Sequence, residues 1–352
     1  MIDIKALSCN EIEAFMEKRG LPAFRGRQLF KWLWKHGIRS INEVTEFSLG
    51  LRQELACELD VYSLVCIKKE ASIDSTIKWA FGLRDGLAIE SVLIPEKDHT
   101  TLCLSTQAGC AMGCAFCLTG RMGLLRNLEA SEIAGQALTV IKDVSQEMRP
   151  RNLVFMGMGE PLANFDNLLK AIEILTHDLG LNFSHRRITV STCGIAPKII
   201  ELGQKSRVGL AISLHATTDR QREKLMPINK VYPIKEVLNA CKRFRLPPRK
   251  RITFEYLLIR GINDSIDDAY RLSELLRGIP SKINLIPFNA SSGLAFEEPS
   301  RESVLKFQDV LKGLNHTVII RKSKGRDINA ACGQLFYKQS DDTYRGKNAT
   351  GC

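Results

Sequence analysis

The chain has 352 residues, of which 44% are hydrophobic and 25% charged, so it is long enough to bury a core and has the composition of a globular protein. Its 50 Lys and Arg against 39 Asp and Glu give a net charge of +11, which favours a polyanionic partner such as RNA, DNA or an anionic membrane surface. No stretch approaches the ~20 apolar residues of a membrane helix, and the N-terminus does not resemble a secretory signal. The 11 cysteines therefore predict metal or redox chemistry in a cytoplasmic protein rather than a disulfide framework.

Residues 1–95 are predicted to form an accessory domain of amphipathic helices with one small hairpin. In the second helical segment Arg27, Lys31 and Lys35 recur every four residues and share one face. A basic face of this kind suits contact with phosphates, and a solvated helix surface is the equally good alternative. Residues 76–92 predict the hairpin.

From residue 96 onward, short apolar runs alternate with segments of helix length. Near-continuous apolar strands alternating with helices predict βαβ units and a parallel sheet. Six or so repeats predict the α/β class and a partial (β/α)6 barrel over residues 96–340, followed by a flexible tail at 341–352. The strand candidates are 101–105, 152–157, 187–191, 208–215, 252–259 and 283–288, with 318–322 as a late addition.

Small and polar residues follow several of these strands at the point where each strand ends. In barrels of this kind the chemistry lies at the C-terminal ends of the strands, so we expect these residues to face one cavity. For His215 alone, a structural hydrogen-bond partner is the commoner alternative. The residues are Gly159, Glu160, Ser191, Ser213, Leu214, His215 and Asn289.

Three cysteines follow the first barrel strand with C-x3-C-x2-C spacing: Cys110, Cys114 and Cys117. Three thiolates so close in sequence can wrap one face of a [4Fe-4S] cube, and because such a cluster takes four ligands, one iron stays open to a small molecule. Gly113 gives the backbone room to curl, and Phe116 offers an apolar shield. Zinc is the alternative metal, but it needs a fourth ligand and typically has paired C-x2-C spacing.

The segments around these residues resemble the RlmN/Cfr group of radical S-adenosylmethionine (SAM) RNA methyltransferases. The matching segments are CLSTQAGCAMGCAFC, FMGMGEPL, ISLHA and NAACGQL, and the resemblance covers roughly residues 20–340. It implies methylation of C2 of an adenosine in large-subunit ribosomal RNA and in tRNA next to the anticodon. Cfr-type methylation of C8 of the same ribosomal adenosine is one alternative, and a non-catalytic iron–sulfur RNA-binding protein is another. The GEPL form of the second motif is closer to the C2 group.

The resemblance also implies a ping-pong mechanism that uses two SAM molecules per turnover. The first SAM methylates Cys332, and the second supplies the radical that activates this S-methyl group for addition to C2. Cys103 is implied as the resolving thiol, which frees the product by forming a transient disulfide with Cys332. Glu90 is implied as the base that removes the C2 proton. The strand-end residues are implied as SAM contacts, with Glu160 on the ammonium group and Leu214 contributing its backbone.

The expected partners are ribosomal RNA and tRNA, together with an electron donor such as a flavodoxin-type protein. We expect a monomer without membrane contact. Two further basic segments, 249–251 and 321–324, are candidates for phosphate contacts. Cys193 is expected to be a packing thiol, and Cys352 has no motif context.

Overall fold

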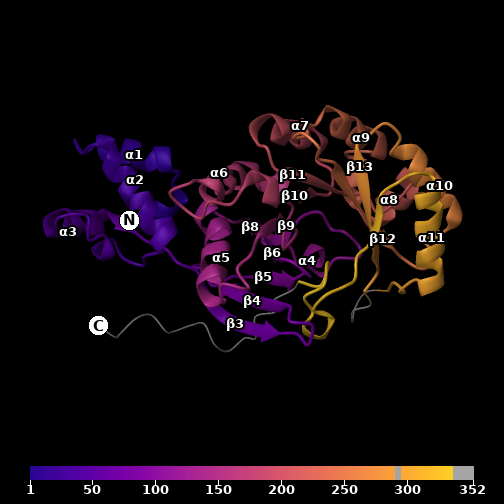
Figure 1. The fold of residues 1–352 in the computed structure, drawn as a ribbon, viewed down its shortest axis with the longest axis horizontal. Helices are drawn as coiled ribbons and strands as arrows, with labels where there is room; N and C mark the ends of the chain where they lie inside the picture. Colours follow the sequence, from indigo (N-terminus) through magenta and orange to yellow (C-terminus); the bar gives the residue numbers. More distant parts are fainter. Residues whose placement is uncertain (290–294, 336–352) are drawn as a thin grey trace.

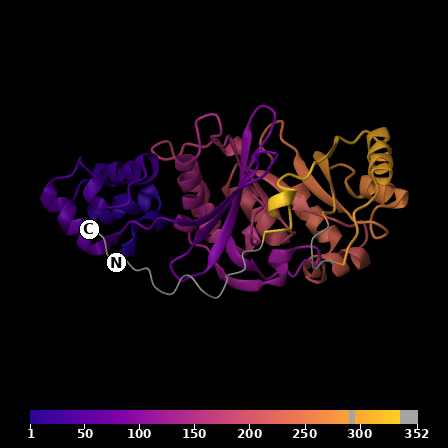
Figure 2. The same cartoon turned by 90° about the horizontal axis from the view of Figure 1, so that it is seen from below.

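The computed structural model describes residues 1–289 and 295–335. The molecule is elongated, with a helical module at one end and a large twisted sheet with its covering helices making up the rest (Figures 1 and 2). Among the described residues, none of the helices is both long and apolar enough to cross a membrane.

A ten-stranded sheet organises the body of the molecule, in the order β14-β13-β12-β11-β10-β9-β6-β5-β4-β3. The strands from β14 to β6 are all parallel to their neighbours. Within the described residues the two ends of this parallel stretch do not pair with each other, so the barrel is open and the predicted partial barrel is confirmed. The parallel strands are β6 (Thr100–Cys103), β9 (Asn152–Phe155), β10 (Ile188–Thr192), β11 (Gly209–Ser213), β12 (Ile252–Leu258), β13 (Ser281–Pro287) and β14 (Val318–Ile320).

Every crossover between successive parallel strands contains at least one helix, which produces the (β/α)6 pattern. Helices cover the outer face of the parallel strands, and most Val, Ile and Leu side chains of these strands are buried, with Ile319 on the edge strand β14 an exposed exception. The helices of the body are α4 (Leu118–Arg121), α5 (Ala130–Asp143), α6 (Phe165–Thr176), α7 (Ala196–Lys205), α8 (Asp219–Leu225), α9 (Ile234–Arg243), α10 (Ile266–Leu275) and α11 (Arg301–Gly313).

Three antiparallel strands extend the sheet beyond β6: β5 (Ala88–Pro95), β4 (Ile77–Gly82) and β3 (Val65–Ala71). The hairpin predicted at 76–92 is formed by β4 and β5, and β5 pairs with β6 through its C-terminal half. The sheet thus continues across the boundary predicted at residue 95. That boundary stays a prediction, and the purely helical part of the N-terminal region is shorter than 95 residues.

The first helix of the N-terminal module, α1, is capped by Ser8. The Ser8 side chain accepts the backbone N–H of Glu11 in a capping box. Of the predicted basic face, Arg27 donates to Glu13 at 3.0 Å, so one of its three charges is already neutralised. The elements are β1 (Ile2–Asp3), α1 (Cys9–Glu17), α2 (Ala23–Lys31), a π-helical turn (Trp32–His36), α3 (Leu49–Glu58) and β2 (Leu59–Asp60).

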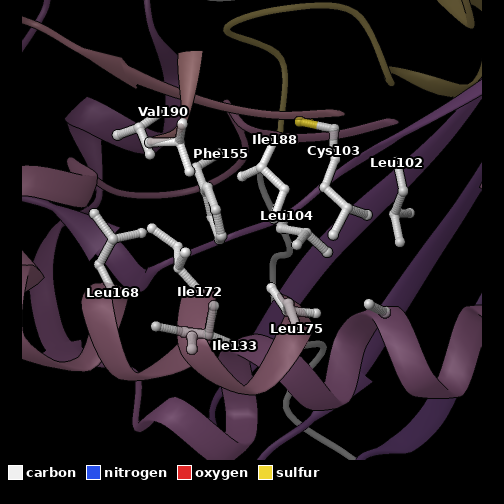
Figure 3. Packing of buried hydrophobic residues seen from close by; sticks show 14 of the residues in the cluster. Leu102, Cys103, Leu104, Ile133, Phe155, Leu168, Ile172, Leu175, Ile188 and Val190 are labelled. Carbon is white, nitrogen blue, oxygen red and sulfur yellow. The ribbon is translucent and has the colours of Figure 1, made fainter. Parts of the chain in front are cut away.

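The core between the sheet and helices α5 and α6 fixes the direction of the side chains on β6. Figure 3 shows Leu104 and Phe155 packed against Ile172 and its neighbours on the helices. Successive side chains of a strand point to opposite faces, so Cys103 points away from this helix layer and into the barrel.

Candidate active site

A cavity of about 190 Å³ opens where the parallel strands end. Because the C-terminal ends of parallel strands meet at one edge of the sheet, it gathers residues that are far apart in the sequence. Two predicted site residues, Leu214 and Glu90, are not part of its described lining. The others all line it: Cys103, Cys110, Cys114, Cys117, Gly159, Glu160, Ser191, Ser213, His215, Asn289 and Cys332.

The loop with the three motif cysteines lies between β7 (Gln107–Cys110) and α4, and β7 pairs with β8 (Gly123–Asn127). The loop curls tightly, with Gly113 at φ 61° and the amide of Cys117 donating to the carbonyl of Cys114 at 3.1 Å. Burial raises the pKa of all three thiols, to about 11 for Cys110. Thiols in such surroundings ionise readily only beside a cation, as a metal cluster would provide.

The three motif thiols lie on one loop and line the same cavity. A [4Fe-4S] cluster is bound by cysteine thiolates, and three of them leave one iron open to a small molecule. Cys110, Cys114 and Cys117 are thus the residues that could hold such a cluster.

Apolar side chains surround the cysteine loop. Phe116 packs edge-on against His215, with ring centroids 4.9 Å apart, and joins a small cluster that includes Leu257 and Ile286. An apolar shell limits the access of water to the sulfur atoms, which is one of the ways a protein tunes the potential of a cluster.

Glu160 is buried directly after β9, and backbone amides hold both of its carboxylate oxygens. Oε1 accepts from Leu162 at 3.0 Å and Oε2 from Cys193 at 2.7 Å. The side chains of Cys193 and Thr192 also hydrogen-bond to this carboxylate, and burial raises its pKa. The preceding residue, Gly159, has φ 101°, and a Cβ there would lie 2.6 Å from the Cβ of Gln107, so only glycine fits.

His215, which follows β11, has a structural role and could also bind a ligand. His215 Nδ1 accepts the backbone N–H of Leu257 at 3.0 Å, which leaves Nε2 as the protonated nitrogen of the neutral ring. Burial, followed by the nearby Arg222, lowers the pKa of His215 to about 3, so the ring is neutral at physiological pH. The backbone of Leu214 is already engaged, since its amide donates to Glu255 and its carbonyl accepts from Arg222.

Arg222 on α8 is a structural residue that the sequence analysis missed. It is fully buried, and it donates to the carbonyls of Cys193, Ser213 and Leu214. It thereby joins the ends of β10 and β11, which carry four of the predicted SAM contacts: Ser191, Ser213, Leu214 and His215. The sequence offers no signal for it, because an arginine on a charged helix normally faces solvent.

The segment that carries Cys332 is bound to the cysteine loop. The amide of Leu118 donates to the Gly333 carbonyl at 2.8 Å, and the Thr119 hydroxyl donates to the Leu335 carbonyl at 2.6 Å. Gly333 has φ 80°, and a Cβ there would lie 3.1 Å from the carbonyl oxygen of Phe116. The small neighbour of Cys332 is thus required by close packing against the loop of the predicted cluster.

The same segment is also fixed to the turn between β3 and β4. The Ser72 hydroxyl donates to Asp327 at 2.6 Å, and the amide of Gly325 donates to Asp74 at 3.0 Å. In Figure 2 the yellow C-terminal segment lies across the purple strands, in agreement with these contacts. The antiparallel extension of the sheet therefore helps to place Cys332, whose side chain remains exposed.

Cys103 and Cys332 line the cavity together, but in different environments. Cys103 is buried, and burial, followed by the neighbouring Cys332, raises the pKa of its thiol to about 12. Its sulfur accepts a backbone hydrogen bond from Met156. A thiol with this pKa is protonated at neutral pH and needs help to act as a nucleophile.

Besides Glu160, two buried carboxylates lie near the cavity, Glu90 and Glu255, and of these two only Glu255 lines it. Glu90 forms an ion pair with the Lys78 ammonium at 3.1 Å. It lies on β5, two residues before Val92, which lines the cavity. Glu255, which the sequence analysis missed, lines the cavity, and burial raises its pKa. Asn284 donates to its Oε1 at 2.9 Å, and its Oε2 has no hydrogen-bond partner among the described residues.

The open parallel barrel, with a C-x3-C-x2-C loop after its first strand and small and polar residues at the following strand ends, defines the class of radical SAM enzymes. Residues 104–273 match the family model of the radical SAM superfamily. A solved radical SAM methyltransferase from Sphaerobacter thermophilus has a TM-score of 0.89 and 40% sequence identity, and the match covers 95% of this chain and 99% of that chain.

The particular family follows from the N-terminal module and from curated relatives. Residues 2–61 match the model described as a ribosomal RNA large subunit methyltransferase N-terminal domain. Dual-specificity RNA methyltransferases RlmN from Geobacter sulfurreducens and Geotalea uraniireducens are both 51% identical, and the matches cover 95% of this chain and 92% and 96% of theirs. The chain belongs to the RlmN family of SAM-dependent RNA methyltransferases, and the predicted family is confirmed.

Proposed function

We propose that this protein methylates C2 of an adenosine in large-subunit ribosomal RNA and of an adenosine next to the anticodon in tRNA. The observation that carries the proposal is that Cys103 and Cys332 line one cavity with the cysteine triplet. The RlmN relatives bear the description dual-specificity, which supports two RNA substrates, and their identity disfavours the C8 alternative. A protein that only binds RNA would not need Cys103 and Cys332 beside the cysteine triplet, so their common cavity disfavours that alternative.

Some residues of the cavity bind the cofactors, and others transfer the methyl group. A [4Fe-4S] cluster bound by the three motif cysteines would supply an electron for the cleavage of SAM. Glu160 binds the ammonium of SAM, and Ser191, Ser213, His215 and Asn289 hydrogen-bond its other polar groups. Cys332, exposed beside this pocket, accepts a methyl group from one SAM and presents it to the adenine, so that two SAM molecules are used per product.

Release of the product uses the second thiol. The Cys103 thiolate attacks Sγ of Cys332, the S–S bond forms, and the bond between Sγ and the CH2 group on the RNA breaks. The electron pair passes to the RNA, giving an enamine that takes up a proton to become the methyl group. Glu90 remains the predicted acceptor of the C2 proton. Its carboxylate is buried and pairs with Lys78.

The RNA must come to this cavity with its base exposed or flipped, since a base inside a duplex stack cannot reach Cys332. Of the predicted basic segments, 249–251 lies at the N-terminal end of β12, away from the strand ends that form the cavity. We further propose that the enzyme acts as a monomer and takes electrons from a flavodoxin-type protein.

Nucleoside mass spectrometry of ribosomal RNA and tRNA treated with the reduced, cluster-loaded enzyme and SAM tests the function. C2-methyladenosine in both RNAs is the expected product. C8-methyladenosine would replace the proposal with its alternative, and intact SAM with unmodified RNA would point to a non-catalytic protein. Mass spectrometry of the protein itself is expected to find a methyl group on Cys332 after incubation with SAM.

Glu160→Gln is expected to weaken SAM binding, because the amide keeps the shape of the side chain but loses the charge that pairs with the ammonium. A charge-assisted hydrogen bond contributes about 1.5–3 kcal/mol, so a rise of the dissociation constant of about tenfold or more is expected by calorimetry. Glu201→Gln on α7, a half-buried glutamate outside the cavity that pairs with Lys198 and Lys205, is the matched control. Equal SAM affinity in both variants would remove Glu160 from the SAM site.

A further inference from the structure

Arg321 belongs to a basic segment that the sequence suggests for phosphate contact, but the structure places it in the reaction cavity. It follows β14, and its amide donates to the Leu285 carbonyl at 2.8 Å. Its side chain lines the cavity together with Cys103 and Cys332, whereas the next residue, Lys322, is exposed.

The side chain of Arg321 reaches across the open barrel from β14 towards the end of β9. Its Nη1 contacts Sδ of Met156 at 4.0 Å, and the backbone of the same Met156 donates to the sulfur of Cys103. Glu255 also lines this cavity and attracts the guanidinium. The guanidinium thus shares one cavity with a carboxylate and with the two thiols that the proposed release step uses.

The electrostatic effects agree with this placement. The strongest influence on Arg321 is Cys332, and together with Glu255 and Cys103 it raises the pKa of the guanidinium. In return, Arg321 opposes the burial that raises the pKa of Cys103, and it is the only cation found to act on that thiol among the described residues. A buried thiolate without such a counter-ion would be costly.

We propose that Arg321 is the counter-ion of the Cys103 thiolate, and that it promotes the attack of Cys103 on the sulfur of Cys332. This rests on the proposed function, which assigns the exchange to these two cysteines. Arg321 acts as a positioning residue: the proton of Cys103 leaves to solvent, and the guanidinium stabilises the anion until the S–S bond has formed.

A mixed disulfide tests the exchange without RNA. In cluster-loaded protein, Cys332 is converted to its glutathione mixed disulfide, and mass spectrometry follows the release of glutathione as the Cys103–Cys332 disulfide forms. Because the pKa of Cys103 is about 12, the rate at neutral pH is proportional to the small fraction of Cys103 that is thiolate. The charged and titratable groups acting on Cys103 are Cys332 and Arg321, so Arg321→Gln is expected to lower this rate by about tenfold, while Arg321→Lys retains most of the wild-type rate.

Lys322→Gln is the matched control, since it removes the same charge one residue further along and from an exposed position. Equal rates of glutathione release in Arg321→Gln and Lys322→Gln would overturn the proposal. Loss of RNA affinity in Arg321→Gln with an unchanged rate of release would overturn it as well, in favour of a phosphate contact. Absence of any release in the wild type would instead contradict the role of Cys103 in the proposed function.

A different observation, a buried lysine beside a cavity of about 600 Å³, carries a second inference. This cleft lies between the N-terminal module and the body, and its lining includes Lys5, Arg39 and Lys142. Lys5 is almost fully buried, donates to the Ser63 hydroxyl at 2.9 Å, and has no ion pair with a carboxylate among the described residues. Two acids of the lining, Asp60 and Asp143, are already paired with other cations.

Burial, and then the repulsion by Lys142 and Arg39, lowers the pKa of Lys5 to about 8, while Asp3 and Glu43 oppose the shift. A cleft that holds three like charges, one of them desolvated, attracts an anion, since a bound anion relieves both the repulsion and the desolvation. We infer that this cleft binds a phosphate group. In an RNA methyltransferase the chemistry suits a backbone phosphate of the substrate, with a free phosphate as the other source of the same group.

RNA affinity over a range of salt concentrations tests this site independently of catalysis. Lys5→Met and Lys142→Met are each expected to reduce the salt slope for an RNA hairpin by about one, whereas Lys205→Met on the exposed face of α7 leaves the slope near that of the wild type. Inorganic phosphate is the second probe, and it is expected to raise the Tm of the wild type more than that of Lys5→Met. Stabilisation by phosphate with unchanged slopes would assign the site to free phosphate, and no change in either measurement would overturn it.

Discussion

Cys332→Ala is expected to abolish methylation of RNA while RNA binding stays intact. The proposed route to C2 passes through a methyl group on this sulfur, because C2 of adenine is not a nucleophile and cannot attack SAM directly. Removal of a residue that carries the transferred group typically costs at least about a thousandfold in rate. Transfer of tritium from methyl-labelled SAM to ribosomal RNA measures the loss, and filter binding measures RNA affinity.

The control for this variant is Cys57→Ala, which removes an exposed thiol from α3 in the N-terminal module. Its activity is expected to match that of the wild type. Cys332 itself is exposed, so its replacement creates no cavity in the core and a loss of activity is not explained by unfolding. Methylated RNA from Cys332→Ala at the wild-type rate would refute the ping-pong mechanism.

The barrel and the cluster loop could be predicted from the sequence because each leaves a local signal. The strands of the body are rich in apolar residues and are separated by helices, and the cysteine triplet lies within eight residues. For strand β5, local sequence patterns do not predict which strand it pairs with in the sheet. Its hairpin is evident, but whether it joins the helical module or the large sheet depends on the pairing of Val92 with Cys103, which only the folded chain reveals.

The roles of the charged residues that support the site could not be predicted from the sequence. Arg222 and Arg321 look like surface charges in the sequence, yet one joins two strand ends and the other lies beside the reacting thiols. Glu255 lies in an apolar strand that predicts only burial. Each of these is a charged residue whose function depends on neighbours from other strands, and such neighbours cannot be inferred from sequence spacing.

Cys103→Ala is expected to trap the enzyme on its RNA. Cys332 remains able to accept the methyl group and join it to the base, so the steps before release proceed. Without Cys103, the other thiols among the described residues that line the cavity with Cys332 are those of the cluster loop, which the cluster would occupy, and Cys193, which is buried beside Glu160. Product formation is expected to stop after one event per enzyme, and a covalent protein–RNA band is expected to accumulate on a denaturing gel.

The chemistry of the trapped species makes this result specific. The CH2 bridge joins Sγ of Cys332 to the base through a thioether, so nuclease digestion and mass spectrometry are expected to find a nucleotide on the peptide that contains Cys332, and reducing agents are not expected to release it. Cys103→Ala/Cys332→Ala serves as the control, since it lacks the sulfur that forms the bridge and is expected to show no band. Because Cys103 is buried, Cys103→Ser provides a second variant of similar volume that also lacks a thiol. Full turnover in Cys103→Ser would show that another group resolves the intermediate and would remove Cys103 from the mechanism.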